Sequence, residues 1–266
     1  MCHLCGHFIN SNDVESNLKL NVSTSTIQRA MNRLGFSYQS VTKKLPLTRK
    51  HKMNRKSSCI KWIEDGLDFS KVVFSDEKRF SLDGPDGYKS YIDKRGRKVQ
   101  VPLRKKRQMG GGSVMVWGCI TSDGSLFIKF IDGKYRSTDY LKDLKTLFIP
   151  WMDNKFGGRN YIFQQDNASI HSSRLVMDWF RKEKIPLIEW PSRSPDFNII
   201  ENVWKMLEDI IYKENQFDSK RKLMDAINLA TEHVQLEMRE KIQNLFKGIH
   251  RRLHQCILNK GEATDY

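Results

Sequence analysis

The sequence predicts a mixed α/β fold, in which one sheet carries helices on its faces. Between residues 70 and 131, short runs rich in Val, Ile and Phe are separated by turn residues, which is typical of hairpins. From residue 137 onward, amphipathic stretches alternate with apolar runs that end near Asp166 and Trp190. Hairpins followed by strand–helix alternation favour a mixed sheet with flanking helices.

Composition indicates a globular protein. The chain has 266 residues and 39% hydrophobic residues, enough for one sizeable core and a small appendage. No apolar run approaches the roughly 20 residues that span a bilayer, and no signal peptide is recognisable, so we expect a soluble, intracellular protein with no membrane partner. Five scattered cysteines argue against a disulfide framework. Cys2 and Cys5 lack a second pair at zinc-ligand spacing, which favours free thiols in a frayed terminus over a zinc site.

The positive charge is concentrated in two tracts. The net charge is +15, and residues 16–63 hold eleven Lys or Arg and no acid. A second tract, Lys94 to Arg107, holds eight Lys or Arg and no acid. Acid-free basic tracts beside a cluster of acids predict polyanion binding, with nucleic acid as the leading candidate.

Residues 1–15 show no clear period and stay unassigned. Ser23 is a candidate N-cap for a helix that ends at Gly35, and a shorter helix is expected to end near Leu20. Two such helices around a tight turn have the shape of a helix-turn-helix, and an ordinary helical hairpin fits equally well. The outer face of the second helix carries side chains suited to phosphates or base edges: Gln28, Arg29, Asn32 and Arg33.

The stretch from Val41 to Lys56 suits a basic linker that follows a phosphate backbone. A solvated surface and a nuclear-import signal are the alternatives. The candidate DNA contacts in this linker are Lys43, Lys44, Arg49 and Lys50. Together, residues 16–62 are expected to form a partial helix-turn-helix region with a basic linker.

Residues 63–215 are predicted to form the α/β domain, and residues 216–266 a helical cap. Pro150 is expected to end a helix that begins at Ser137, and a later helix carries Glu201. Strands are expected over 71–82, 87–93, 110–120, 126–132, the run ending at Asp166, and 186–190. This order is the one found in the ribonuclease H-like fold. Two amphipathic helices, marked by Leu223 to Val234 and Ile242 to Leu253, make up the cap.

Three acids on separate elements are expected to meet at one edge of the sheet: Asp76 in the middle or at the end of the first strand, Asp166 at the end of a central strand, and Glu201 at a helix start. A two-metal phosphoryl-transfer site needs carboxylates from separate elements, and hard divalent ions prefer oxygen ligands. Each acid also has a simpler interpretation. Glu77 is an alternative to Asp76, Asp166 fits a loop turn, and Glu201 fits a capping box with Asn198 as N-cap.

At these residues the sequence resembles the DDE transposases of the Tc/mariner superfamily, in its Tc-type branch. The resemblance rests on V-V-F-S-D-E-K-R-F, G-G-G-S-V-M-V-W-G-C-I, F-Q-Q-D-N-A-S-I-H and W-P-S-R-S-P-D-F-N-I-I-E-N-V-W. It implies that Asp76, Asp166 and Glu201 are the catalytic triad and bind two Mg²⁺ or Mn²⁺ ions in a ribonuclease H-like core. It also implies cleavage at transposon ends and strand transfer into DNA at a TA step.

The resemblance implies double-stranded DNA partners, namely terminal inverted repeats and a target site, a homodimer in the synaptic complex, and a nuclear protein. Only the end of the second of the family's two helix-turn-helix units is recognisable, so an N-terminally truncated member is expected. His171 stands where the family often has a histidine, and we interpret it as support for the acids or as a DNA contact, with a helix-start residue as the alternative. A domesticated DNA-binding protein and an enzyme acting on RNA–DNA hybrids are the competing functions.

Overall fold

The computed structural model describes residues 22–33, 46–84, 112–158, 160–213 and 217–264. The chain divides into two units, Met1–Lys44 and Leu45–Tyr266. The predicted strand 87–93, the second basic tract, the Cys2 and Cys5 pair, and Lys43 and Lys44 all lie outside the described residues.

The first unit contributes one described helix, α2 (Thr24–Arg33). It begins where Ser23 was expected to cap it, since the Ser23 side chain accepts a bond from the Thr26 amide. Arg29 and Arg33 are exposed on this helix. The helix expected to end near Leu20 lies outside the described residues, so the helix-turn-helix stays a prediction.

In the described part of the second unit, four strands form one sheet in the order β3-β2-β1-β4. They are β1 (Val72–Ser81), β2 (Ser113–Ile120), β3 (Leu126–Ile131) and β4 (Ile162–Gln164). β1 pairs antiparallel with β2 and parallel with β4, so the sheet is mixed as predicted. The strand expected over 186–190 is reduced to a single parallel bridge between Phe163 and Leu187. Pro186 begins this run and Pro191 follows it, and neither has the backbone N–H that a ladder uses, which limits the pairing at both ends.

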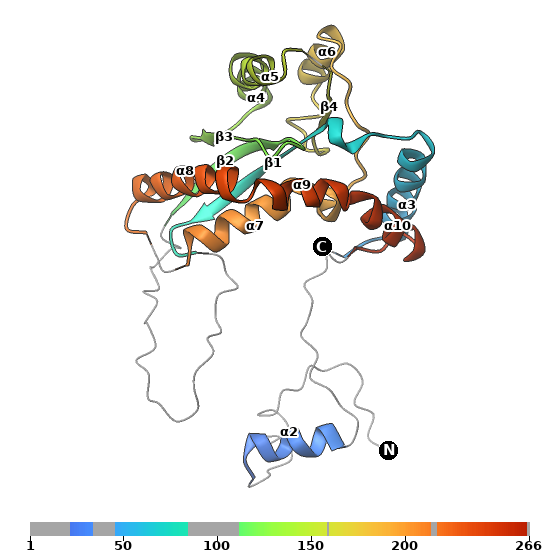
Figure 1. Ribbon diagram of the computed structural model, residues 1–266, viewed down its shortest axis with the longest axis vertical. Coiled ribbons are helices and arrows are strands. Elements are labelled where there is room, and N and C mark those ends of the chain that lie inside the picture. The colour runs from blue at the N-terminus through green and yellow to red at the C-terminus, as the bar shows by residue number, and fades with distance from the viewer. Residues whose placement is uncertain (1–21, 34–45, 85–111, 159, 214–216, 265–266) are drawn as a thin grey trace. The chain divides into compact units, whose positions relative to one another are not determined.

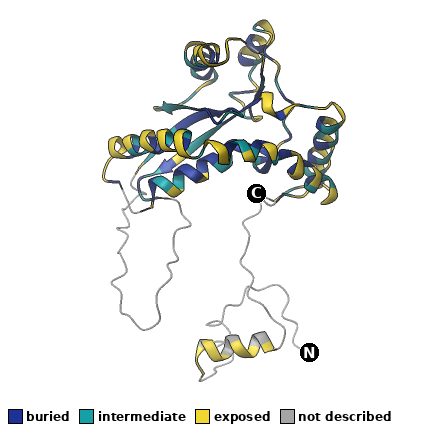
Figure 2. Ribbon diagram, viewed as in Figure 1, coloured by how far each residue is buried: buried dark blue, intermediate teal, exposed yellow. Residues whose placement is uncertain are grey.

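Helices cover both faces of the sheet (Figure 1). One face packs against α7 (Ile199–Ile211), α8 (Lys220–Glu237), α9 (Arg239–Lys247) and α10 (Ile249–Leu258), and this core also includes α3 (Arg49–Glu64). The other packs against α4 (Ser137–Asp143), α5 (Ile149–Phe156) and α6 (Arg174–Lys182). Figure 2 shows the strands mostly buried or intermediate and α8 with an exposed outer stripe. No helix of the described residues has both the length and the apolar character for a membrane crossing.

Two helix boundaries differ from the sequence predictions. Pro150 does not end the helix that begins at Ser137: a π-helix, η3 (Leu144–Phe148), follows α4, and α5 continues to Phe156. Pro150 stands at the start of α5, where its missing N–H costs nothing. The second cap helix is divided into α9 and α10 at Gly248, while the predicted apolar positions of α8 are buried as expected.

The segment Arg49–Glu64 is a helix rather than the basic linker that we expected over its first residues. Thr48 caps it and accepts a bond from the His51 amide, while the His51 ring accepts one from the Thr48 amide. Arg55, Cys59 and Trp62 are buried at helical spacing. Arg49 and Lys50 are exposed in its first turn, so these two predicted DNA contacts are accessible.

Candidate active site

The register of β1 and β4 brings two of the predicted acids together. Phe74 is paired with Gln164 at the end of the parallel ladder. Asp76 and Asp166 each stand two residues beyond this pair, at the point where β1 and the segment after β4 separate. The Ser75 hydroxyl donates to the Gln164 carbonyl over 2.7 Å, and the Ser75 amide donates to the Gln164 side chain over 3.0 Å. These bonds hold the two chains together immediately before the acids.

The third acid is placed by the cap of α7. The Asn198 side chain accepts a bond from the Ile200 amide and donates from its amide nitrogen to the Ser75 carbonyl, 3.1 Å away. One residue therefore both caps the helix and ties its first turn to β1, beside Asp76. Within the residues that the structure describes, Glu201 returns no side-chain bond to Asn198, so the capping box that we considered is not formed. The Glu201 carboxylate remains available to the cleft.

Asp76, Asp166 and Glu201 line one open cleft of about 500 Å³. Its other walls come from Asn167 and Ala168, from the segment Trp190 to Pro195, and from Asn198. The Asn167 side chain donates to the Trp190 carbonyl over 2.8 Å, which joins the loop after β4 to the segment before α7. The cleft therefore unites the three elements to which sequence reasoning assigned the chemistry.

The environment of this cleft disfavours the charged forms of two of its acids. Burial and the nearby Glu201 and Glu77 carboxylates raise the pKa of Asp76 to about 8. The Trp204 ring nitrogen donates to Asp76 Oδ2 over 3.3 Å, and this bond opposes the rise in pKa. Burial also raises the pKa of Glu201, opposed by the attraction of Lys78. Carboxylate oxygens are the donors that a hard divalent cation prefers, and a bound cation would displace the protons that these raised pKa values favour. Within the described ranges, however, no three His, Cys, Asp or Glu side chains lie at metal-holding spacing.

Asp166 differs from the other two acids because it has a strong partner. Its Oδ1 accepts a 2.6 Å bond from His171 Nδ1 and a 2.9 Å bond from the Ala168 amide. The His171 bond, only partly offset by burial, lowers the pKa of Asp166. His171 Nε2 lies 3.0 Å from a Glu77 oxygen. Burial opposes a charge on the ring, but the bonds to Asp166 and Glu77 raise the pKa of His171 to about 9.

This geometry favours one of the interpretations of His171. Its ring is buried and both of its nitrogens are occupied by carboxylates, so the structure leaves no part of it for the predicted DNA contact. These contacts favour the interpretation that His171 supports the acids, since it bonds directly to Asp166. Glu77 is turned to this partner rather than to the cleft, which disfavours it as a replacement for Asp76.

The cleft also depends on a residue pair that sequence reasoning missed. Gly118 is paired with Asp76 across β1 and β2, and the Trp204 ring lies against it. A Cβ at Gly118 would stand 2.5 Å from Trp204 Cη2 and 3.0 Å from the Phe127 carbonyl oxygen. The available signal was a glycine inside a strand, which often marks a close approach.

We expect the substitution Gly118→Ala to destabilise the protein by about 1–3 kcal/mol, because overpacking displaces the Trp204 ring that donates to Asp76. Thermal unfolding measures the effect. Gly158→Ala is the matched control, since a Cβ there meets nothing within 4 Å. Equal melting temperatures of the two variants would contradict the steric role of Gly118.

Neutralising Asp76 should stabilise the protein in the absence of divalent ions. In the folded chain Asp76 keeps its proton up to about pH 8, whereas the unfolded chain releases it near pH 4. Folding stability therefore falls as the pH rises between these values. A pKa difference of about four units, at about 1.4 kcal/mol each, predicts that Asp76→Asn gains up to about 5 kcal/mol, or about 10–20 °C, at pH 8 and almost nothing at pH 4. Melting curves in EDTA test this, and an Asp76→Asn variant less stable than wild type at pH 8 would refute it.

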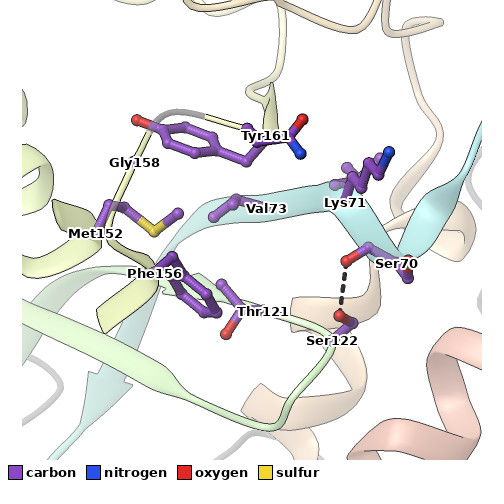
Figure 3. Close-up of a pocket in the computed structure, with 11 residues that line it drawn as sticks. Ser70, Lys71, Val73, Thr121, Ser122, Met152, Phe156, Gly158 and Tyr161 are labelled. Carbon is purple, nitrogen blue, oxygen red and sulfur yellow. Dashed lines mark hydrogen bonds between the residues drawn. The ribbon is translucent and has the colours of Figure 1, made fainter. Parts of the chain in front are cut away.

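A second pocket, of about 230 Å³, lies at the opposite end of β1 from Asp76. Figure 3 shows Val73, Met152, Phe156 and Tyr161 around it, with the Ser122 hydroxyl donating to the Ser70 carbonyl over 2.6 Å. None of the predicted site residues lines this pocket. The chemistry is therefore sought in the acidic cleft.

A mixed sheet of this order, with acids from β1, the end of β4 and α7 at one cleft, defines a nuclease of the ribonuclease H-like class. The model of a family described as DDE superfamily endonuclease matches residues 71–224. The chain is 34% identical over 262 residues to the Tc3 transposase of Caenorhabditis elegans, covering 96% of this chain and 75% of that protein. It is 31% identical over 256 residues to the Tc1 transposase of the same organism, covering 92% of this chain and 88% of that protein.

Solved structures agree on the fold. A Mos1 transposase paired-end complex with the left transposon end matches at a TM-score of 0.73 and 18% identity, over 97% of this chain and 76% of that chain. The catalytic domain of Mos1 mariner transposase matches at 0.64 and 15% identity, over 84% of this chain and all of that chain. This protein belongs to the DDE superfamily of endonucleases, and within it to the Tc/mariner transposases. The predicted family and fold class are thereby confirmed.

Proposed function

We propose that this protein is a DDE transposase that cuts DNA at the ends of a transposon and joins the freed ends to target DNA at TA steps. Asp76, Asp166 and Glu201 are its catalytic residues and hold two Mg²⁺ or Mn²⁺ ions. The observation that carries the proposal is the cleft shared by three acids from three separate elements. The similarity to Tc-type transposases supports the reaction class.

The residues of the cleft fit the ions by their chemistry. Burial raises the pKa of Asp76 and of Glu201, so a cation that neutralises them would favour their ionised, ligating forms. The fold relatives include Mos1 paired-end complexes with Mn and with Mg, which supports the same ions here. Because the described acids are not gathered at metal-holding spacing, we expect ion binding to draw their side chains together.

The protein's own contribution to the reaction is positioning. Bound divalent ions supply a more acidic water and stabilise charge on phosphate oxygens. Asn198 fixes the turn that presents Glu201, the Trp204 indole holds Asp76 by one oxygen, and His171 holds Asp166 by one oxygen. Two of the acid side chains and the backbone that carries the third are thus held in place before DNA arrives, which favours catalysis by orientation.

The partners in this proposal are double-stranded transposon ends and a target duplex, with two copies of the chain in the synaptic complex and the nucleus as the place of action. Solved Mos1 structures are described as paired-end complexes, with the left transposon end, with Mn or with Mg, which supports this arrangement. Gln28, Arg29, Asn32, Arg33, Lys43, Lys44, Arg49 and Lys50 remain the proposed DNA contacts, and Arg29, Arg33, Arg49 and Lys50 are exposed.

The proposal is tested by incubating the full chain with labelled duplexes that carry a transposon end, with Mn²⁺, Mg²⁺ or EDTA. Ion-dependent nicking at the end supports it. Binding to the duplex with no cleavage under any ion would instead favour a DNA-binding protein without transposition. Cleavage confined to RNA–DNA hybrids would favour the hybrid-specific alternative.

A further inference from the structure

Glu77 follows Asp76 on β1 but faces the opposite side of the sheet, because successive side chains of a strand alternate. Asp76 meets Trp204 of α7, whereas Glu77 meets His171 near the start of α6. The proposed catalytic chemistry uses Asp76 and leaves Glu77 without a role. A carboxylate beside a buried histidine, with 22% of its side chain exposed, therefore calls for a function of its own.

His171 is held in a fixed orientation by contacts of its ring and of its backbone. Its ring lies 4.5 Å from the Tyr140 ring, centroid to centroid, and its carbonyl accepts a 3.1 Å bond from the Gln165 side chain. Gln165 in turn accepts a 2.9 Å bond from the Tyr140 hydroxyl. The ring therefore has little freedom to turn, and its Nδ1 is directed at Asp166 while Nε2 is directed at Glu77.

We infer that Glu77 is a positioning residue for Asp166 and acts on it through His171. This inference rests on the proposed function, since it assigns Asp166 to the ion site. Glu77 holds one side of the ring, so that the other side holds Asp166 Oδ1. In the described part of the chain both side-chain bonds of Asp166 go to Oδ1, so Oδ2 would be the oxygen open to an ion in the cleft.

The inference explains why an exposed loop residue is suited to bind an ion. Asp166 is 53% exposed and lies beyond the end of β4, where a lone carboxylate would rotate freely. Hydrogen-bonded partners of ligating groups typically account for 10–100-fold in metal affinity, because they orient the ligand. The bonds from His171 and Ala168 restrain Asp166 in this way, and Glu77 restrains His171.

The test measures Mn²⁺ binding to the full chain without DNA, by electron paramagnetic resonance of free Mn²⁺. Glu77→Gln is expected to weaken binding about 10-fold. His171→Asn retains a donor at the position of Nδ1 and loses the link to Glu77, so it should weaken binding by a similar factor. The double variant should bind no more weakly than His171→Asn alone, because Glu77 has lost its route to Asp166.

Two further variants make the test specific. His171→Gln keeps a donor for Glu77 and loses the one for Asp166, and is expected to weaken Mn²⁺ binding at least as much as Glu77→Gln. Asp143→Asn is the matched control, because Asp143 is a buried acid in α4 that accepts a bond from the Tyr135 hydroxyl and has no bond to His171. It should leave Mn²⁺ affinity within twofold of wild type. Melting temperatures of all variants separate loss of fold from loss of affinity.

Two results would overturn the role of Glu77. One is Mn²⁺ affinity of Glu77→Gln within twofold of wild type. The other is a further 10-fold loss when Glu77→Gln is added to His171→Asn, which would mean that Glu77 acts without His171. Failure of the wild-type chain to bind Mn²⁺ at all would instead overturn the proposed function, and with it the inference.

Discussion

Replacing Asp166 by Asn is expected to reduce DNA cleavage by about 10³-fold or more while DNA binding stays equal or becomes slightly tighter. A ligating carboxylate contributes several kcal/mol to stabilising charge at the reacting phosphate, and each 1.4 kcal/mol is a factor of ten in rate. The amide oxygen can still accept the bonds from Ala168 and His171, so the loop after β4 should keep its shape. Binding does not suffer because a negative charge that faces phosphate has been removed.

Single-turnover cleavage of an end-bearing duplex in Mn²⁺, with a parallel binding titration, measures both effects. Asp178→Asn is the control, since Asp178 is an exposed acid of α6 whose charged partners, Arg174 and Arg181, are also exposed. Cleavage by this control should equal that of wild type. An Asp166→Asn variant that cuts DNA at the wild-type rate would remove Asp166 from the catalytic residues.

The convergence of the three acids could be predicted because each stands in or next to an element with a strong local pattern: Asp76 lies within β1, Asp166 just beyond β4 and Glu201 in the first turn of α7. The apolar run before Asp166 and the stripe of α7, with Ile200 and Leu207 buried, are local signals that the structure confirms. Once the strands are placed, the register alone brings Asp76 and Asp166 together. Sequence reasoning therefore reached the cleft without any contact information.

The supporting contacts could not be predicted, because their partners are distant in sequence and polar. Glu77 and His171 are 94 residues apart, and the only local clue was that both flank a candidate acid. The helix Arg49–Glu64 was hidden for a related reason. Its buried stripe begins with Arg55, so the apolar period that marks a core-facing helix is broken by a charged residue.

Arg55 of α3 anchors the segment that lines the cleft before α7. Its guanidinium makes two bonds to the Asp196 carboxylate, at 2.7 and 2.6 Å, and donates to the Arg193 carbonyl over 3.1 Å. Arg193 has a φ of 57°, a left-handed conformation that is costly for a side chain other than glycine and persists only where surrounding bonds impose it. Asp196 also accepts bonds from the amide and hydroxyl of Thr264. The segment that lines the cleft before α7 is thus tied to α3 and to the last described residues.

Replacing Arg55 by Met should therefore destabilise the protein by about 3–5 kcal/mol, or a fall of about 6–20 °C in melting temperature. Both partners are buried, so the variant leaves the Asp196 carboxylate without its cation in a site that water does not reach. Lys61→Met, on the same helix, breaks the exposed pair with Glu189 and should cost at most about 1 kcal/mol. Thermal unfolding of the two variants side by side measures the difference. If Arg55→Met lost no more stability than Lys61→Met, the buried pair could not be what holds the segment before α7 against α3, and the position of Glu201 would have to depend on the Asn198 cap alone.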